Sequence, residues 1–272
     1  MNGLIVAAGV ALTVNSAAGY VAYRRGSVSG SGALAGAFVG SAIMIAGGLH
    51  YWLMLMIFFV SSSAAGRIGG MRRPSLEQMH ERGSRRDWVQ VAANGGVAAA
   101  AVVLLALSGR AHFGIAAAGA LAGATADTWA SELGVLSRRR PRSVITFKLL
   151  EPGTSGGVSL LGTIAGAAGS MLIAFWFALI EGRAEAFPTF AAIWFAGLAG
   201  TTVDSILGAT VQAQYRDDEG RLTERPTGGS GRNRLVRGLA FVRNDAVNLA
   251  ASVFAAIVAV VLAAGLSAVP AR

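Results

Sequence analysis

Four carboxylates lie inside, or at the start of, long apolar stretches of the chain: Asp127, Glu132, Asp204 and Asp245. An ionisable side chain at the centre of a bilayer costs roughly 2.5–3.5 kcal/mol on insertion scales, so these residues indicate function. No lysine or arginine lies inside the apolar stretches to neutralise them. A bound divalent cation would offset their charge. We therefore predict a metal site made by these four residues, of which Asp127, Glu132 and Asp204 are catalytic.

The metal that this ligand set favours is Mg²⁺, because carboxylate oxygens are hard ligands. The chain has no cysteine, and its three histidines lack the spacing of a zinc site. Asp127 and Glu132 are five positions apart, which places them roughly 140° apart around a helix. They can therefore bind one ion from different sides, or they can bind two ions.

Amide side chains lie in the same predicted half of the membrane as the acids. Asn244 and Asn248 are four positions apart, so they share one helix face, and Asn94 lies in another apolar stretch. A single intramembrane amide more often bonds a neighbouring helix than a ligand. Their position beside the acids favours the second role, and we predict that all three hold nucleotide or phosphate oxygens.

A Gly-Thr-Ser-Gly-Gly run occupies residues 153–157, directly before an apolar stretch. Backbone amides in such a turn, together with a helix N-terminus, can bind an anion. Glycines before a helix are also ordinary turn chemistry. We predict phosphate contacts from this segment and from basic side chains near it. The predicted phosphate-binding residues are Thr154, Ser155, Gly156, Gly157, Ser159, Arg86, Lys148 and Arg243.

Stretches of roughly 17–25 apolar residues are long enough to cross a bilayer as helices. We predict eight such spans, at 3–22, 30–47, 49–66, 88–108, 112–136, 158–180, 189–214 and 245–268. Gly47 and Gly48 must form a tight turn between the second and third spans. If they do not, that region is re-entrant and seven spans remain. The predicted fold class is all-α, a polytopic transmembrane helical bundle that forms one domain over residues 1–272.

The composition supports this class, since 54% of the residues are hydrophobic and 14% are charged, with a mean hydropathy of +0.56. Soluble proteins carry about 25% charged residues. The 37 glycines lie mostly within the apolar stretches. Small residues there allow helix backbones to approach closely, so we expect Gly/Ala-rich packing.

The net charge of +9 is concentrated in alternate loops, which hold 20 of the 23 basic residues. This distribution is typical of the positive-inside rule and argues against a nucleic acid partner. With eight spans it predicts that both termini lie outside. The acids then fall in the cytoplasmic half, so the active site is predicted to face the cytoplasm from the cell inner (plasma) membrane.

Five motifs resemble those of one integral membrane family. They are Trp-Val-Gln-Val-Ala-Ala-Asn-Gly-Gly (88–96), Ala-Asp-Thr-Trp-Ala-Ser-Glu-Leu-Gly (126–134), Gly-Thr-Ser-Gly-Gly-Val-Ser-Leu-Leu-Gly-Thr (153–163), Val-Asp-Ser-Ile-Leu-Gly-Ala-Thr (203–210) and Asn-Asp-Ala-Val-Asn (244–248). They occur in the family's order within residues 60–252, the predicted catalytic core. The family, first defined as a domain of unknown function, includes the chloroplast phytyl-phosphate kinase. It is distantly similar to dolichol kinases and CDP-lipid synthases.

The resemblance implies a prenyl-phosphate kinase that uses CTP, or another nucleoside triphosphate, with Mg²⁺. Its acceptor would be a membrane-embedded prenyl (phytyl-like) monophosphate, which becomes the diphosphate. A monophosphate has a second pKa of about 6, so it needs no strong general base. Two other enzymes stay open, a CTP-dependent cytidylyltransferase and a polyprenol kinase. A cation or lipid-phosphate transporter is a further alternative, although the polar groups crowd one face and no inverted repeat is evident.

Overall fold

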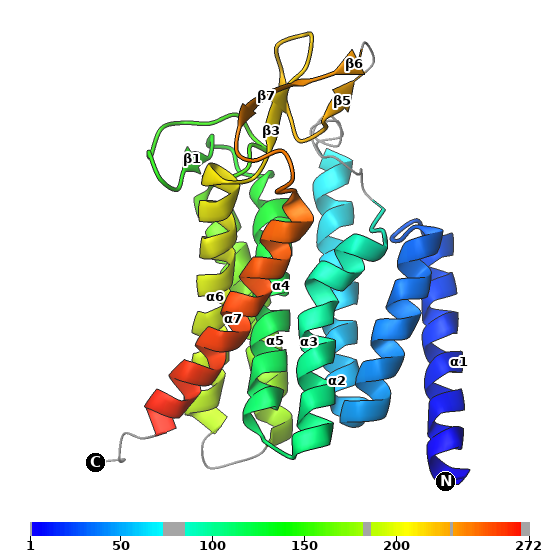
Figure 1. Cartoon of the computed structure of the whole chain (residues 1–272). Helices are drawn as coiled ribbons and strands as arrows, with labels where there is room; N and C mark the ends of the chain where they lie inside the picture. The colour runs from blue at the N-terminus through cyan, green and yellow to red at the C-terminus, as the bar shows by residue number, and fades with distance from the viewer. Residues whose placement is uncertain (1, 73–84, 182–185, 229–230, 268–272) are drawn as a thin grey trace.

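The computed structural model describes residues 2–72, 85–181, 186–228 and 231–267. Its helices are α1 (Asn2–Arg24), α2 (Gly30–Arg72), α3 (Trp88–Ser108), α4 (His112–Gly134), α5 (Leu160–Glu181), α6 (Ala186–Thr210) and α7 (Asn244–Ser267). Its strands are β1 (Arg142–Ser143), β2 (Gly157–Val158), β3 (Gln214–Arg216), β4 (Leu222–Thr223), β5 (Thr227–Gly228), β6 (Gly231–Arg232) and β7 (Arg234–Arg237). The fold is the predicted all-α membrane bundle, with small antiparallel sheets over one end (Figure 1).

The long helix α2 folds back on itself at Gly48. A straight helix of 43 residues would be about 65 Å long, twice the ~30 Å of a hydrocarbon core. Gly48 has φ 72° and ψ −167°, a conformation that breaks the helix. Arg86 contacts both arms of α2. In the first arm, a Cβ added to Gly32 would meet the carbonyl oxygen of Arg86. In the second arm, Ser63 Oγ accepts a hydrogen bond from the Arg86 guanidinium at 3.4 Å. The arms therefore run in opposite directions (Figure 1), and the tight turn predicted at Gly47–Gly48 is confirmed.

Six helices among the described residues have the length and apolar composition of a membrane span, and α2 counts once although it has two arms. Helix α4 is not one of the six. It packs against α2, α3, α5, α6 and α7, and every residue from 117 to 126 is buried. Since a helix enclosed by protein can carry polar groups toward the bundle interior, α4 does not need an apolar outer surface. The number of eight crossings stays a prediction.

Small residues set the distances around α4. A Cβ on Gly119 would lie 2.5 Å from the Cβ of Ala259 on α7. A Cβ on Gly162 of α5 would lie 2.8 Å from the carbonyl oxygen of Ala130. Only glycine allows these approaches without moving a helix, so the expected Gly/Ala-rich packing is confirmed.

The span predicted over 189–214 is too long at its carboxyl end. Helix α6 stops at Thr210, and the amide of Ala213 donates to the carbonyl oxygen of Val242 at 2.8 Å. The next residue, Gln214, begins β3, which pairs with both β4 and β7. Glutamine is a good helix former, so the sequence pattern continues where tertiary pairing ends the helix.

The strands of the described residues lie at one end of the bundle, whereas α1 begins and α7 ends at the opposite end (Figure 1). The basic segments 138–142, 216–228 and 231–243 belong to the strand-bearing end. Of the six arginines between Arg67 and Arg86, Arg73 and Arg82 lie outside the described residues. This arrangement agrees with the charge asymmetry found in the sequence. The assignment of this end to the cytoplasm, with both termini outside, stays a prediction.

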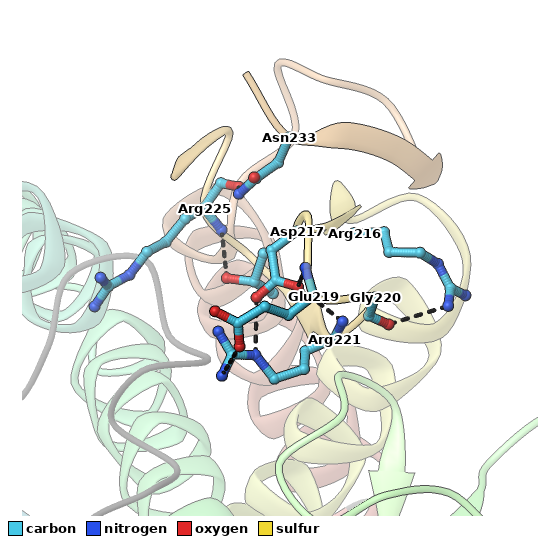
Figure 2. A network of polar contacts seen from close by, with 8 residues as sticks. Arg216, Asp217, Glu219, Gly220, Arg221, Arg225 and Asn233 are labelled. Atoms are coloured by element: carbon cyan, nitrogen blue, oxygen red, sulfur yellow. Dashed lines mark hydrogen bonds and ion pairs between the residues drawn. The ribbon is translucent and has the colours of Figure 1, made fainter. Parts of the chain in front are cut away.

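A polar network holds the turn between β3 and β4 (Figure 2). Asp217 Oδ1 accepts hydrogen bonds from the amides of Glu219 and Arg221, at 3.0 and 2.8 Å, and Arg221 Nε donates to Asp217 Oδ2 at 2.9 Å. Desolvation by itself raises the pKa of Asp217, but the hydrogen bonds from Arg221 lower it below the ordinary 3.8. Arg216 donates to the carbonyl oxygen of Gly220 at 3.1 Å. These two arginines therefore stabilise the turn.

Candidate functional site

A cavity of about 860 Å³ lies at the strand-bearing end of the bundle. Residues from α2 to α7 line it, together with the segment 152–159 and two residues of the strand region. Its charged lining consists of four arginines and five carboxylates, Arg25, Arg67, Arg86, Arg139, Asp127, Glu132, Asp204, Glu224 and Asp245. Both cations and anions can therefore be held there, which suits a metal–phosphate ligand.

All but two of the predicted site residues line this cavity. They are Arg86, Asn94, Asp127, Glu132, Thr154, Ser155, Gly156, Gly157, Ser159, Asp204, Asn244, Asp245 and Asn248. Lys148 and Arg243 do not line it, and both are exposed. Lys148 lies shortly before the 153–163 motif, and Arg243 lies directly before the 244–248 motif. Both side chains nevertheless lie on the exposed surface of their loops.

Asp127 on α4 and Asp204 on α6 face each other within hydrogen-bonding range. Thr201 adds a hydrogen bond from its hydroxyl to Asp127 Oδ1 at 3.3 Å. Asp127 and Asp204 come from different helices and are far apart in the chain, so this pair depends on how closely α4 and α6 pack.

Two glycines one helical turn away from the acids bring the helices together. Gly123 precedes Asp127 by four residues, and Gly200 precedes Asp204 by four, so each glycine shares a face with its acid. A Cβ on Gly200 would lie 3.5 Å from Gly123 Cα and 2.9 Å from the Cβ of Ala255 on α7. A Cβ on Gly123 would lie 2.8 Å from the same Ala255 atom. The repeated Gly-x-x-x-Asp pattern was therefore a readable signal that sequence reasoning missed.

Glu132 faces a different neighbour. A Cβ added to Gly66 of α2 would lie 3.6 Å from the carboxyl carbon of Glu132. A Cβ added to Gly69 would meet the backbone carbonyl oxygen of Glu132. Its charge also acts on Arg86: burial lowers the pKa of Arg86, and Glu132 opposes that effect. Among the described residues, no group of three or more His, Cys, Asp or Glu side chains is placed to hold one metal ion. The four predicted carboxylates thus line one cavity without forming a single ligand shell.

Buried polar atoms without a hydrogen-bond partner gather at this cavity. They include Asp204 Oδ2, Asn248 Oδ1, Thr154 Oγ1 and Ser62 Oγ. Leaving such an atom unsatisfied costs about 1–3 kcal/mol, so a ligand or ordered water is expected beside each one. All four are oxygens, which are the atoms that Mg²⁺ binds in proteins. One of them, Asp204 Oδ2, belongs to the carboxylate pair with Asp127, and the oxygen donors of this pair fit Mg²⁺.

The glycine-rich segment 153–157 is shaped mainly by its contact with α6. Gly156 has φ 80°, and a Cβ there would lie 2.7 Å from Ala209 Cα. The amide of Gly157 already donates to the carbonyl oxygen of Thr154 at 3.0 Å. Ser159 caps α5, since its hydroxyl accepts from the amide of Gly162 at 3.1 Å. Much of the predicted phosphate cradle is thus engaged within the protein, and the unpartnered Thr154 hydroxyl is its most available group.

Four residues, which we call the latch, join this segment to the strand region: Ser155, Gln212, Glu224 and Arg237. Ser155 Oγ donates to Glu224 Oε1 at 2.7 Å, and Gln212 Nε2 donates to the same oxygen at 2.8 Å. Arg237 donates to the carbonyl oxygens of Ser155 and Gly208, at 3.1 and 2.9 Å. Because the partners are distant in the chain, no local motif signals the latch.

Replacing Gln212 by Ala should loosen the segment 153–157. The change removes a hydrogen bond to a carboxylate, a kind that contributes about 1.5–3 kcal/mol. We expect amide hydrogen exchange at residues 153–157 and 222–225 to become about tenfold faster. Thr227→Ala, on the exposed strand β5, is the matched control. Unchanged exchange in the Gln212 variant would show that the latch does not hold this segment.

Comparison with known proteins places the chain among membrane proteins. The family model described as "Integral membrane protein DUF92" matches residues 13–256. Protein PGR of Arabidopsis thaliana is 34% identical over 229 residues, which cover 74% of this chain and 78% of that protein. The membrane protein MJ0933 of Methanocaldococcus jannaschii is 32% identical over 178 residues, which cover 65% of this chain and 72% of that protein. No solved structure matches the chain.

Proposed function

We propose that this chain, which belongs to the integral membrane protein family DUF92, is a CTP-dependent kinase that converts a membrane-embedded prenyl monophosphate to its diphosphate. One observation carries the proposal: Asp127 and Asp204 pair across α4 and α6, and Asp204 Oδ2 has no partner inside the cavity. The cavity volume of about 860 Å³ lies within the range of roughly 300–1,000 Å³ typical of small-molecule sites.

Asp127 and Asp204 would hold Mg²⁺, which when bound neutralises charge on the nucleotide phosphates. Proteins usually bind Mg²⁺ through one or two carboxylates, with phosphate oxygens and water as the other ligands. A pair of acids therefore suffices, and the absence of a larger cluster among the described residues fits this mode. Asp245, buried at the start of α7, lines the same cavity but is not placed with Asp127 and Asp204 as a third ligand, and the charge of Glu132 favours the cationic form of Arg86.

Arg86 is proposed to bind the phosphate of the acceptor. Burial lowers its pKa and Glu132 opposes this effect, but a guanidinium remains protonated in proteins. Asn94 and Asn248 would position oxygens on either side. Their Nδ2 groups would donate to those oxygens, whereas Asn248 Oδ1, which has no partner within the protein, would accept from a ligand hydroxyl or a water.

The reaction transfers one phosphoryl group. An oxygen of the prenyl monophosphate attacks the γ-phosphorus of CTP, and the bond from that phosphorus to the β,γ-bridging oxygen breaks. The products are prenyl diphosphate and CDP. Phosphoryl transfer depends mainly on positioning and charge stabilisation. No strong general base is needed because the monophosphate is already largely ionised near neutral pH.

Product identification tests the proposal. The purified protein is incubated with CTP, Mg²⁺ and a prenyl monophosphate, and the nucleotide and lipid products are identified. CDP with prenyl diphosphate supports the kinase. Pyrophosphate with transfer of CMP would replace it by a cytidylyltransferase. No turnover with any nucleoside triphosphate would favour a transporter.

A further inference from the structure

A second, smaller cavity lies between α1, the two arms of α2, and α3. Its volume is about 80 Å³, and its lining is almost entirely apolar. We call it the α1–α3 groove; it is lined by Ala18, Gly36, Val39, Leu55, Phe58 and Phe59, among others. Several of these residues are only partly buried, so the groove is open toward the outside of the bundle.

The groove adjoins the polar cavity. Arg86, Gln90 and Asn94 line both of them. The guanidinium of Arg86 lies 5.9 Å from the centre of the Phe59 ring, a cation–π distance that holds the charge at the junction. The polar atoms of these three residues, which can bind an anion, therefore lie directly beside the apolar surface of the groove. A ligand that crosses this junction must have an anionic head and an apolar chain.

We infer that the α1–α3 groove binds the chain of the acceptor next to its phosphate, so that α1, α2 and α3 form the lipid-binding part of the enzyme. The identity of the head group rests on the proposed function. A volume of 80 Å³ is too small for a whole ligand. The groove therefore binds only the first part of the chain, and the remainder lies in the bilayer.

Gly36 is the position at which the inference can be tested by filling the groove. A Cβ on Gly36 would meet no atom within 4 Å, so a larger side chain fits there. Gly36 lies one helical turn, about 6 Å, beyond Gly32, which contacts Arg86. Leucine at this position should therefore obstruct a long chain and leave room for a single isoprene unit.

Gly36→Leu should lower kcat/KM for a twenty-carbon prenyl monophosphate by about tenfold or more, the size expected for steric exclusion from an apolar pocket. It should change kcat/KM for a five-carbon prenyl monophosphate by less than about twofold. Gly96→Leu is the matched control, because Gly96 also has open space and lines neither cavity. Equal losses for both substrates, or no loss for either, would overturn the inference.

Photo-crosslinking gives a readout that does not depend on turnover. A fifteen-carbon prenyl monophosphate with a diazirine on its chain is irradiated with the full-length protein, and the labelled peptides are identified. Label within 36–39 and 55–59 that is lost in Gly36→Leu supports the groove. Label on other helices only, label unchanged by the substitution, or no specific label would each overturn it. If crosslinking succeeds while no phosphoryl group is transferred, the proposed function fails and the lipid site stands.

Discussion

Replacing Asp127 by Asn should lower the rate of the proposed phosphoryl transfer by about 1,000-fold, the scale seen when one preorganised electrostatic contact is removed from an active site. Asparagine keeps the volume of the side chain but removes its charge and puts a hydrogen-bond donor in place of one oxygen. The proposed Mg²⁺ site would then have one carboxylate, that of Asp204, in place of two. The rate is measured with saturating CTP across a range of Mg²⁺ concentrations.

The Asp127 variant should remain folded. Two acids that face each other repel when both are ionised, so removing one charge should leave the thermal midpoint in a chelator unchanged or higher. Asp218→Asn makes the same chemical change on an exposed turn and should retain full activity. If Asp127→Asn turns over CTP at a near-normal rate, the assignment of this acid to the metal is wrong.

Replacing Gly123 by Val should separate α4 from α6 and α7. Even a Cβ at this position lies 2.8 Å from Ala255 Cβ, and valine adds two methyl groups beyond it. Overpacking of this kind costs about 1–3 kcal/mol of folding free energy. Because Asp127 lies one turn further along the same face, the pair with Asp204 widens, and misplacement by about 1 Å costs about 100-fold in rate. Thermal unfolding and turnover are both measured.

The control for this change is Gly265→Val on α7, where a Cβ would meet no atom within 4 Å. This variant places valine in a helix at a position that makes no contact with another helix. It should retain its activity. The proposed role of Gly123 would be contradicted if its valine variant unfolded at the same temperature as the parent protein and kept its activity.

The sequence predicts the class of fold and the position of most of the site because these depend on local composition. Apolar length indicates the helices, and the high cost of a buried charge identifies Asp127 and Asp204. The turn at Gly48 is also local, since two adjacent glycines interrupt an apolar stretch that is too long for one crossing. The spacing of Asp127 and Glu132 predicts that the two side chains point in different directions from one helix. In the structure Glu132 faces α2, whereas Asp127 faces α6.

Features that depend on contacts between distant segments could not be predicted in this way. In the sequence Gln212 continues the helical pattern, yet in the structure it lies past the end of α6 and donates a hydrogen bond to Glu224. Lys148 lies close to the glycine-rich segment in the chain, but its loop leaves it exposed. Charge and proximity in sequence do not determine on which side of a folded loop a side chain lies.

The enclosure of α4 has a consequence for how the protein is made. Although α4 is surrounded by five other helices, its composition is not that of a membrane span, so it should partition poorly from the translocon into lipid by itself. Helices α2 and α3 are synthesised before it and supply one side of its surroundings, whereas α5, α6 and α7 emerge later and supply the other. Biogenesis should therefore require α4 to stay beside α2 and α3 until α5, α6 and α7 have been synthesised.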